Sequence, residues 1–191
     1  ARIDADGIVS GQPQRVSPAA GGGWNYRIGG WRTGGSPLLA DGDRVWLAYT
    51  SAYFNGDYTN SEGWTTVTLV VVSAAGDIAR HALQPAENGV TATDATLFRL
   101  DGKLGVLWSE GTMIYICGGC FADNDLKLVL VDPDAIVPAS EVATHAHADH
   151  GYVGPAAVVV GSDVLSVSSQ DFHALSFPAV AVMTCVAKGA P

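Results

Sequence analysis

The sequence predicts an all-β fold built from repeated four-stranded antiparallel units. Apolar residues make up 48% of the 191 residues, yet they occur in short runs rather than long ones. Many of the 23 glycines fall between these runs, and the pattern of run, tight turn and run recurs along the chain. Short apolar runs separated by turn residues are typical of strands joined by hairpins.

The repeat is clearest around three tight turns. Residues 38–50 and 97–109 each contain an apolar run, an Asp-Gly turn and a second apolar run. A weaker third copy covers residues 157–168, with Gly161 and Ser162 at its turn. Such dipeptides favour hairpins because their residues tolerate positive φ. The copies lie about 60 residues apart, somewhat more than the period of common propeller blades.

A second pair of strands is expected after each hairpin. The run at 67–73 leads into a turn at 74–77, and the run at 126–132 leads into Pro133 and Asp134. The first residues carry such a second pair alone, and a final strand is expected over 179–187. We therefore expect one all-β domain or propeller segment with units at residues 1–17 (partial), 36–84, 94–144 and 155–191 (partial).

The pattern resembles the β-propeller-like repeats of secreted bacterial proteins. In those repeats a proline precedes the first strand, glycines mark the turns, and an aromatic residue ends the second strand. The matching residues here are Pro37, Gly42, Tyr49 and Gly76 in one unit, and Gly102 and Trp108 in the next. The resemblance implies a propeller-like fold, and the number of units implies an incomplete ring, since closed rings usually have four to eight blades. A β-sandwich is the alternative architecture.

Charge and composition exclude two classes of partner. A formal net charge of −9 disfavours nucleic-acid binding, because an acidic surface repels phosphate. No run of 18 apolar residues occurs, so no membrane span is expected. The low lysine content, the high content of Gly, Thr and Ser, and a close cysteine pair favour a secreted or extracellular protein.

Aromatic residues gather in two segments, 21–32 and 52–64, that are expected to be long loops on one face of the units. Aromatic rings among Asn, Asp and Arg suit contacts with sugars, peptides or another protein. Packing of the loops, or a buried subunit contact, is the alternative explanation. The candidate binding residues are Trp24, Tyr26, Trp31, Tyr53, Phe54, Tyr58 and Trp64.

Two of the three cysteines lie close together across a Gly-Gly turn. Cys117 and Cys120 are expected to form a disulfide in an exported chain. Zinc ligation, a redox pair and free thiols are the alternatives. Cys185 lies in an alternating apolar run and is expected to be a small buried hydrophobe.

A histidine cluster is the sharpest local motif. His145, His147, Asp149 and His150 match the signature of metallo-β-lactamase-fold hydrolases. That fold needs helices and further ligands downstream, where His173 is the only histidine, so we interpret the match as coincidental. Zinc or copper binding by these five residues, converging from neighbouring loops, is a separate expectation.

These observations favour an extracellular binding or structural module, part of a larger assembly, over an enzyme. Another polypeptide chain or self-association would complete the assembly, and the long loops would contact a partner, a glycan or a peptide. One alternative is a metal-dependent hydrolase that uses the histidine cluster, although no catalytic residue is assigned. The other alternative is a carbohydrate-binding lectin.

Overall fold

The fold consists of antiparallel strands. The computed structural model describes residues 2–3, 6, 9–12, 14, 16, 24–27, 36–53, 64–88, 91–114, 120–138, 143–148, 152–170 and 180–188. These ranges contain no helix, and hence no helix that could cross a membrane. The predicted all-β class is confirmed.

The first sheet is formed around β5 and β6. Along the hydrogen-bonded path, β5 pairs with β6 and β6 pairs with β7, while β3 and β4 both pair with β5. Its strands are β3 (Trp24–Arg27), β4 (Leu38–Asp41), β5 (Arg44–Tyr53), β6 (Trp64–Ser73) and β7 (Ile78–Asn88).

The second sheet repeats this arrangement. Its neighbouring pairs are β8 with β9 and β9 with β10, while two strands pair with the outer side of β10. Its strands are β8 (Thr91–Leu100), β9 (Lys103–Ile114), β10 (Cys120–Asp132), β11 (Val137–Pro138) and β12 (Ala143–Ala148).

The third sheet has three described strands in chain order, and a small two-stranded sheet lies near the start of the chain. The third sheet comprises β13 (Tyr152–Val160), β14 (Asp163–Gln170) and β15 (Val180–Lys188). The small sheet comprises β1 (Arg2–Ile3) and β2 (Val9–Ser10). The repeated meander is propeller-like, as the sequence predicts.

All three predicted hairpin turns are present. Gly42, Gly102 and Gly161 have φ values of 58°, 76° and 64°, and Asp101 has a φ of 49°. These left-handed conformations let a short loop reverse the chain without splaying the twisted strands. The turn dipeptides therefore set the register of each hairpin.

The prediction of loops at 21–32 and around the histidine cluster is wrong for the residues of these segments that the structure describes. Residues 24–27 form β3, and residues 143–148 form β12. The reason is hydrogen bonding. The short β4 pairs with only four residues of β5, and β3 supplies partners for Thr50–Tyr53. In the same way β12 pairs with β10 beyond the reach of β11.

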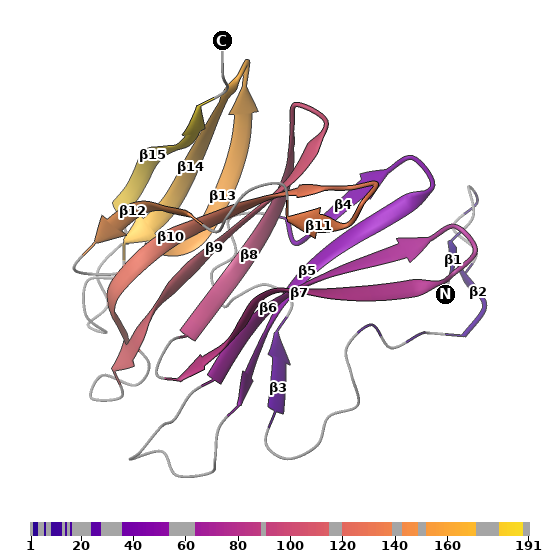
Figure 1. Ribbon diagram of the computed structural model, residues 1–191, viewed down its shortest axis with the longest axis horizontal. Coiled ribbons are helices and arrows are strands. Elements are labelled where there is room, and N and C mark those ends of the chain that lie inside the picture. The colour runs from indigo at the N-terminus through magenta and orange to yellow at the C-terminus, as the bar shows by residue number, and fades with distance from the viewer. Residues whose placement is uncertain are drawn as a thin grey trace.

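The three sheets pack face to face in chain order (Figure 1). We call the face that packs on the following sheet the forward face and the opposite face the rear face. The forward face of the first sheet includes Leu39, Trp46 and Ala48, which share one core with the rear face of the second sheet. That rear face includes Leu97, Leu104, Val106 and Trp108.

The second sheet is buried on both faces. Its forward face, with Phe98, Leu100 and Leu107, packs on Val164 and Ala157 from the rear face of the third sheet. A sheet covered on both faces forms the middle of three layers. The described strands therefore form a stack of sheets rather than a two-layer sandwich.

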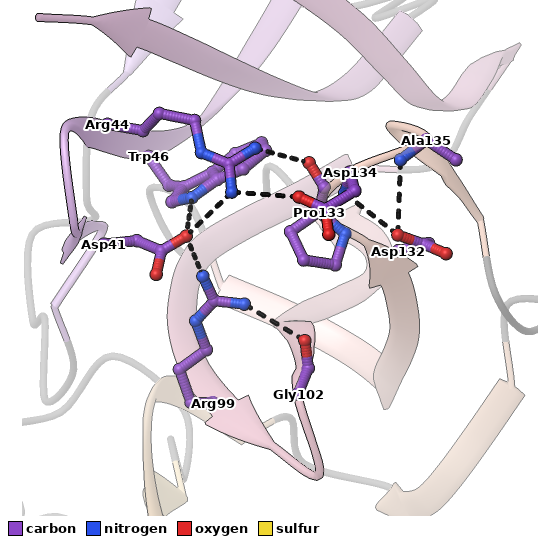
Figure 2. A network of polar contacts seen from close by, with 9 residues as sticks. All are labelled: Asp41, Arg44, Trp46, Arg99, Gly102, Asp132, Pro133, Asp134 and Ala135. Carbon is purple, nitrogen blue, oxygen red and sulfur yellow. Dashed lines mark hydrogen bonds and ion pairs between the residues drawn. The ribbon is translucent and has the colours of Figure 1, made fainter.

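A polar network joins the hairpin of the first sheet to the second sheet (Figure 2). Asp41 accepts a hydrogen bond from the Trp46 indole N–H at 3.3 Å and forms ion pairs with Arg44 and Arg99. Arg99 comes from β8, so its ion pair with Asp41 crosses between the sheets. These groups hold the pKa of Asp41 below its ordinary value, with the Trp46 hydrogen bond as the largest cause and the two guanidinium groups adding to it.

Arg44 extends the network to the turn after β10. Its guanidinium donates to the carbonyl of Pro133 at 2.9 Å and to the carboxylate of Asp134 at 3.2 Å. The turn is held by Asp132, whose carboxylate accepts the backbone amides of Asp134 and Ala135 and whose pKa is lowered by these bonds. One hairpin thus contacts both strand β8 and the turn after β10 of the neighbouring sheet.

Substitution of Gly105 tests the tight packing of the second sheet. Gly105 is in register with Phe98, and a Cβ added at Gly105 would overlap the Phe98 ring. Gly105→Ala should lower the free energy of unfolding by about 1–3 kcal/mol, as overpacking does. Urea unfolding of Gly105→Ala, Phe98→Leu and the double variant measures the coupling. Additive effects of the two substitutions would contradict the contact.

Substitution of Asp41 tests the network through its pH dependence. A carboxylate with a lowered pKa in the folded state stabilises the protein above the unfolded pKa, and this contribution is lost as the pH falls through the folded value. Asp41→Asn keeps an acceptor for Trp46 but removes the charge. It should therefore be less stable than wild type at pH 6, and the difference should shrink below pH 3.8, the ordinary value.

Urea midpoints between pH 6 and pH 3 measure this difference. Asp43→Asn removes the same charge from an exposed position of the same turn and serves as the control. A stability difference between wild type and Asp41→Asn that stays constant over this range would show that the ion pairs contribute nothing.

Candidate functional site

The strands have a hairpin end and a loop end. The β4–β5, β8–β9 and β13–β14 turns lie along the upper side of Figure 1, whereas β5 and β9 end toward its lower side. The hairpin end is closed by tight turns and by the Asp41 network. The loop end holds most of the described candidate residues, and long irregular connections tend to carry binding sites.

An aromatic row crosses the first sheet at its loop end. Trp24 on β3 is in register with Tyr53 on β5, and Tyr53 is in register with Trp64 on β6. Trp64 is in turn in register with Asn88 on β7. The fold therefore aligns three aromatic residues that are far apart in the sequence.

The other predicted aromatic residues are placed less completely. Tyr26 lies on β3, in register with Ser51 of β5. Trp31, Phe54 and Tyr58 lie outside the described residues. The row of Trp24, Tyr53 and Trp64 is thus the part of the predicted binding surface that lies within the described residues, and ligand binding by these residues stays a prediction.

The loop end of the second sheet holds a cluster of charged residues. Glu110 on β9 has 9% relative exposure, and its carboxylate accepts a hydrogen bond from the Trp108 indole at 3.1 Å. The Lys127 ammonium lies 3.8 Å from Glu110 Oε1 and 3.1 Å from Asp125 Oδ2. Asp125 is the cross-strand neighbour of Glu110.

Strand alternation positions these residues on one face. Glu110 follows Trp108 by two residues, and Lys127 follows Asp125 by two, so all four lie on the rear face of the second sheet. β10 has register shifts on both sides of Asp125, and such bulges can re-aim a side chain. The cluster places two carboxylates beside one ammonium in a largely buried position.

Sequence analysis missed this charged cluster. The available signal was one charged residue, Glu110, at the end of an apolar run, and two charged residues at alternate positions, Asp125 and Lys127, at the start of another. Alternation alone gives the face of each strand but not which strands are neighbours. The pairing of β9 with β10 brings Glu110 and Asp125 together.

The predicted metal ligands are only partly described. His145 and His147 lie on β12, and His147 is in register with Asp125 of β10. Asp149, His150 and His173 lie outside the described residues. Within the described part of the chain, no three His, Cys, Asp or Glu residues gather as a metal site.

The predicted disulfide stays a prediction. Cys120 is the first residue of β10, and Cys117 lies outside the described residues. Cys185 lies on β15, in register with Leu165 of β14, so its predicted position in a strand agrees with the structure.

No protein-family model and no curated protein sequence matches this chain. Fourteen chains of solved structures match it, including the two that follow. Sucrose-6-phosphate hydrolase from Lactobacillus gasseri aligns with 73% of this chain and 28% of its own, at 15% identity and a TM-score of 0.46. A GH43 endo-arabinanase from Bacillus licheniformis aligns with 78% of this chain and 71% of its own, at 8% identity and a TM-score of 0.37. At these TM-scores, neither likeness bears on the function of this chain.

Proposed function

We propose that the chain is an extracellular carbohydrate-binding module, with its binding surface at the loop end of the first sheet. The observation that carries this proposal is the row of Trp24, Tyr53 and Trp64 on three neighbouring strands. Aromatic side chains offer flat apolar faces together with polar groups, which suits the apolar faces and hydroxyl groups of sugar rings.

The dimensions of the row suit a short oligosaccharide. Neighbouring strands are about 4.8 Å apart, so three strands present a platform about 10 Å long. Asn88 is in register with Trp64, at the β7 end of the row. Amide side chains both donate and accept hydrogen bonds, as the recognition of hydroxyl groups requires.

Substitution of Trp64 tests the proposal. A glycan array identifies the sugar that wild type binds, and isothermal titration calorimetry measures its affinity. Trp64→Ala removes one of the three aromatic residues and should weaken binding at least about tenfold, which corresponds to roughly 1.4 kcal/mol. Trp24→Ala should weaken binding similarly.

Thr68→Ala provides the matched control, because Thr68 lies on the same strand nearer the hairpin end. It should bind as wild type does. An array without any bound glycan, or a Trp64→Ala variant with unchanged affinity, would contradict the proposal. Binding to peptides but not to glycans would assign the row to protein recognition instead.

A metal site at the loop end of the second sheet is a second candidate. Although the described residues do not gather as a metal site, the register places Glu110, Asp125 and His147 on three neighbouring strands. Carboxylate and imidazole groups are ligands for zinc and for copper. The Lys127 ammonium, 3.1 Å from Asp125, competes with a cation for the same oxygen atoms.

This competition gives the test. Lys127→Ala should raise the affinity for zinc, because it removes a positive charge beside the two carboxylates. Titration calorimetry with zinc, and metal analysis after dialysis, measure this change. Lys103→Ala removes the same charge from an exposed position at the hairpin end and should leave zinc binding unaltered. Absence of zinc binding in both wild type and Lys127→Ala would exclude the site.

A further inference from the structure

The two outer faces of the stack expose apolar side chains at the hairpin end. Leu38 and Val45, on the rear face of the first sheet, are 52% and 43% exposed. Val158 and Val160, on the forward face of the third sheet, are 50% and 57% exposed. Of the five exposed large apolar side chains in the described part of the chain, four lie on these two faces.

The repeat relates the two exposed faces to the two buried interfaces. When the hairpins are aligned at their turns, Val158 occupies the position of Leu39 in the first sheet and Phe98 in the second. Leu39 and Phe98 both pack on the rear face of the next sheet. Inside the molecule, a forward face is thus covered by a rear face in both cases.

The exposed rear face completes the same pattern. Leu38 occupies the position of Leu97 in the second sheet and Ala157 in the third, and both of those residues contact the forward face of the preceding sheet. Val16 packs on the rear face of the first sheet, against Leu47, Tyr49 and Val70, which lie farther from the β4–β5 turn. Leu38 and Val45, nearer the turn, keep their exposure.

We propose that two copies of the chain associate head to tail, with the forward face of the third sheet in one copy covering the rear face of the first sheet in the other. The contact repeats the packing already present twice within the chain. A head-to-tail contact closes into a ring when the rotation allows.

Leu38 and Val45 lie at the hairpin end of the rear face of the first sheet, and strand alternation places the aromatic row at the loop end of the same face. Because the two sets of residues differ, association between copies and carbohydrate binding are tested by separate variants. Sedimentation velocity at micromolar concentration should give a mass about twice 19.7 kDa for wild type. The double variants Val158→Asp/Val160→Asp and Leu38→Asp/Val45→Asp should each sediment as monomers, because a carboxylate would be buried in the contact.

Mixing the two variants makes the test specific. A pair of unlike variants retains one unaltered forward face and one unaltered rear face, so an equimolar mixture should regain a dimer. Ala75→Asp, in the exposed β6–β7 turn, is the charge-matched control and should remain dimeric. Circular dichroism and urea midpoints verify that each variant is folded, as expected for substitutions of exposed residues.

Three outcomes would overturn the proposal. A monomeric wild type would show that the faces do not associate between copies. A dimer that survives Leu38→Asp/Val45→Asp but not Val158→Asp/Val160→Asp would indicate contact between like faces. A mixture of the two variants that stays monomeric would exclude the head-to-tail arrangement. None of these results depends on whether the chain binds a sugar.

Discussion

The burial of both faces of the second sheet is the constraint on which the rest of the structure depends. Apolar side chains of β8, β9 and β10 cover both faces of the second sheet, and Leu104, Val106 and Leu107 have no exposed surface. Burial of apolar surface stabilises the fold by about 25 cal/mol for each Å² removed from water. A sheet of this kind is stable only between two others, so the first and third sheets are held in place by the second.

The two ends of the strands differ in the contacts that they make. At the hairpin end, tight turns and the Asp41 network fix how the first sheet sits on the second. At the loop end, the register aligns Trp24, Tyr53 and Trp64. A binding surface supported by neighbouring strands is better defined than one carried by loops alone, since strand pairing sets the spacing of its residues.

Sequence patterns predicted the hairpins and the alternation well because these are local. Asp-Gly and Gly-Ser dipeptides require only their own backbone preferences, and all three turns appear where they were expected. β3 and β12 were missed, because each forms against a strand edge left open by a shorter neighbour. Whether such an edge is open depends on the length of other strands, which no local pattern contains.

By itself, the sequence determined the all-β class, the hairpin positions and the face on which each strand residue lies, because turn preference and two-residue alternation act within a few neighbours. The tertiary structure alone decided which strands are adjacent. It joined Asp41 to Arg99 across two sheets, brought Glu110 beside Asp125, and aligned the three aromatic residues. These contacts link residues far apart in the chain, and they follow from the need to bury each apolar face and pair each strand edge.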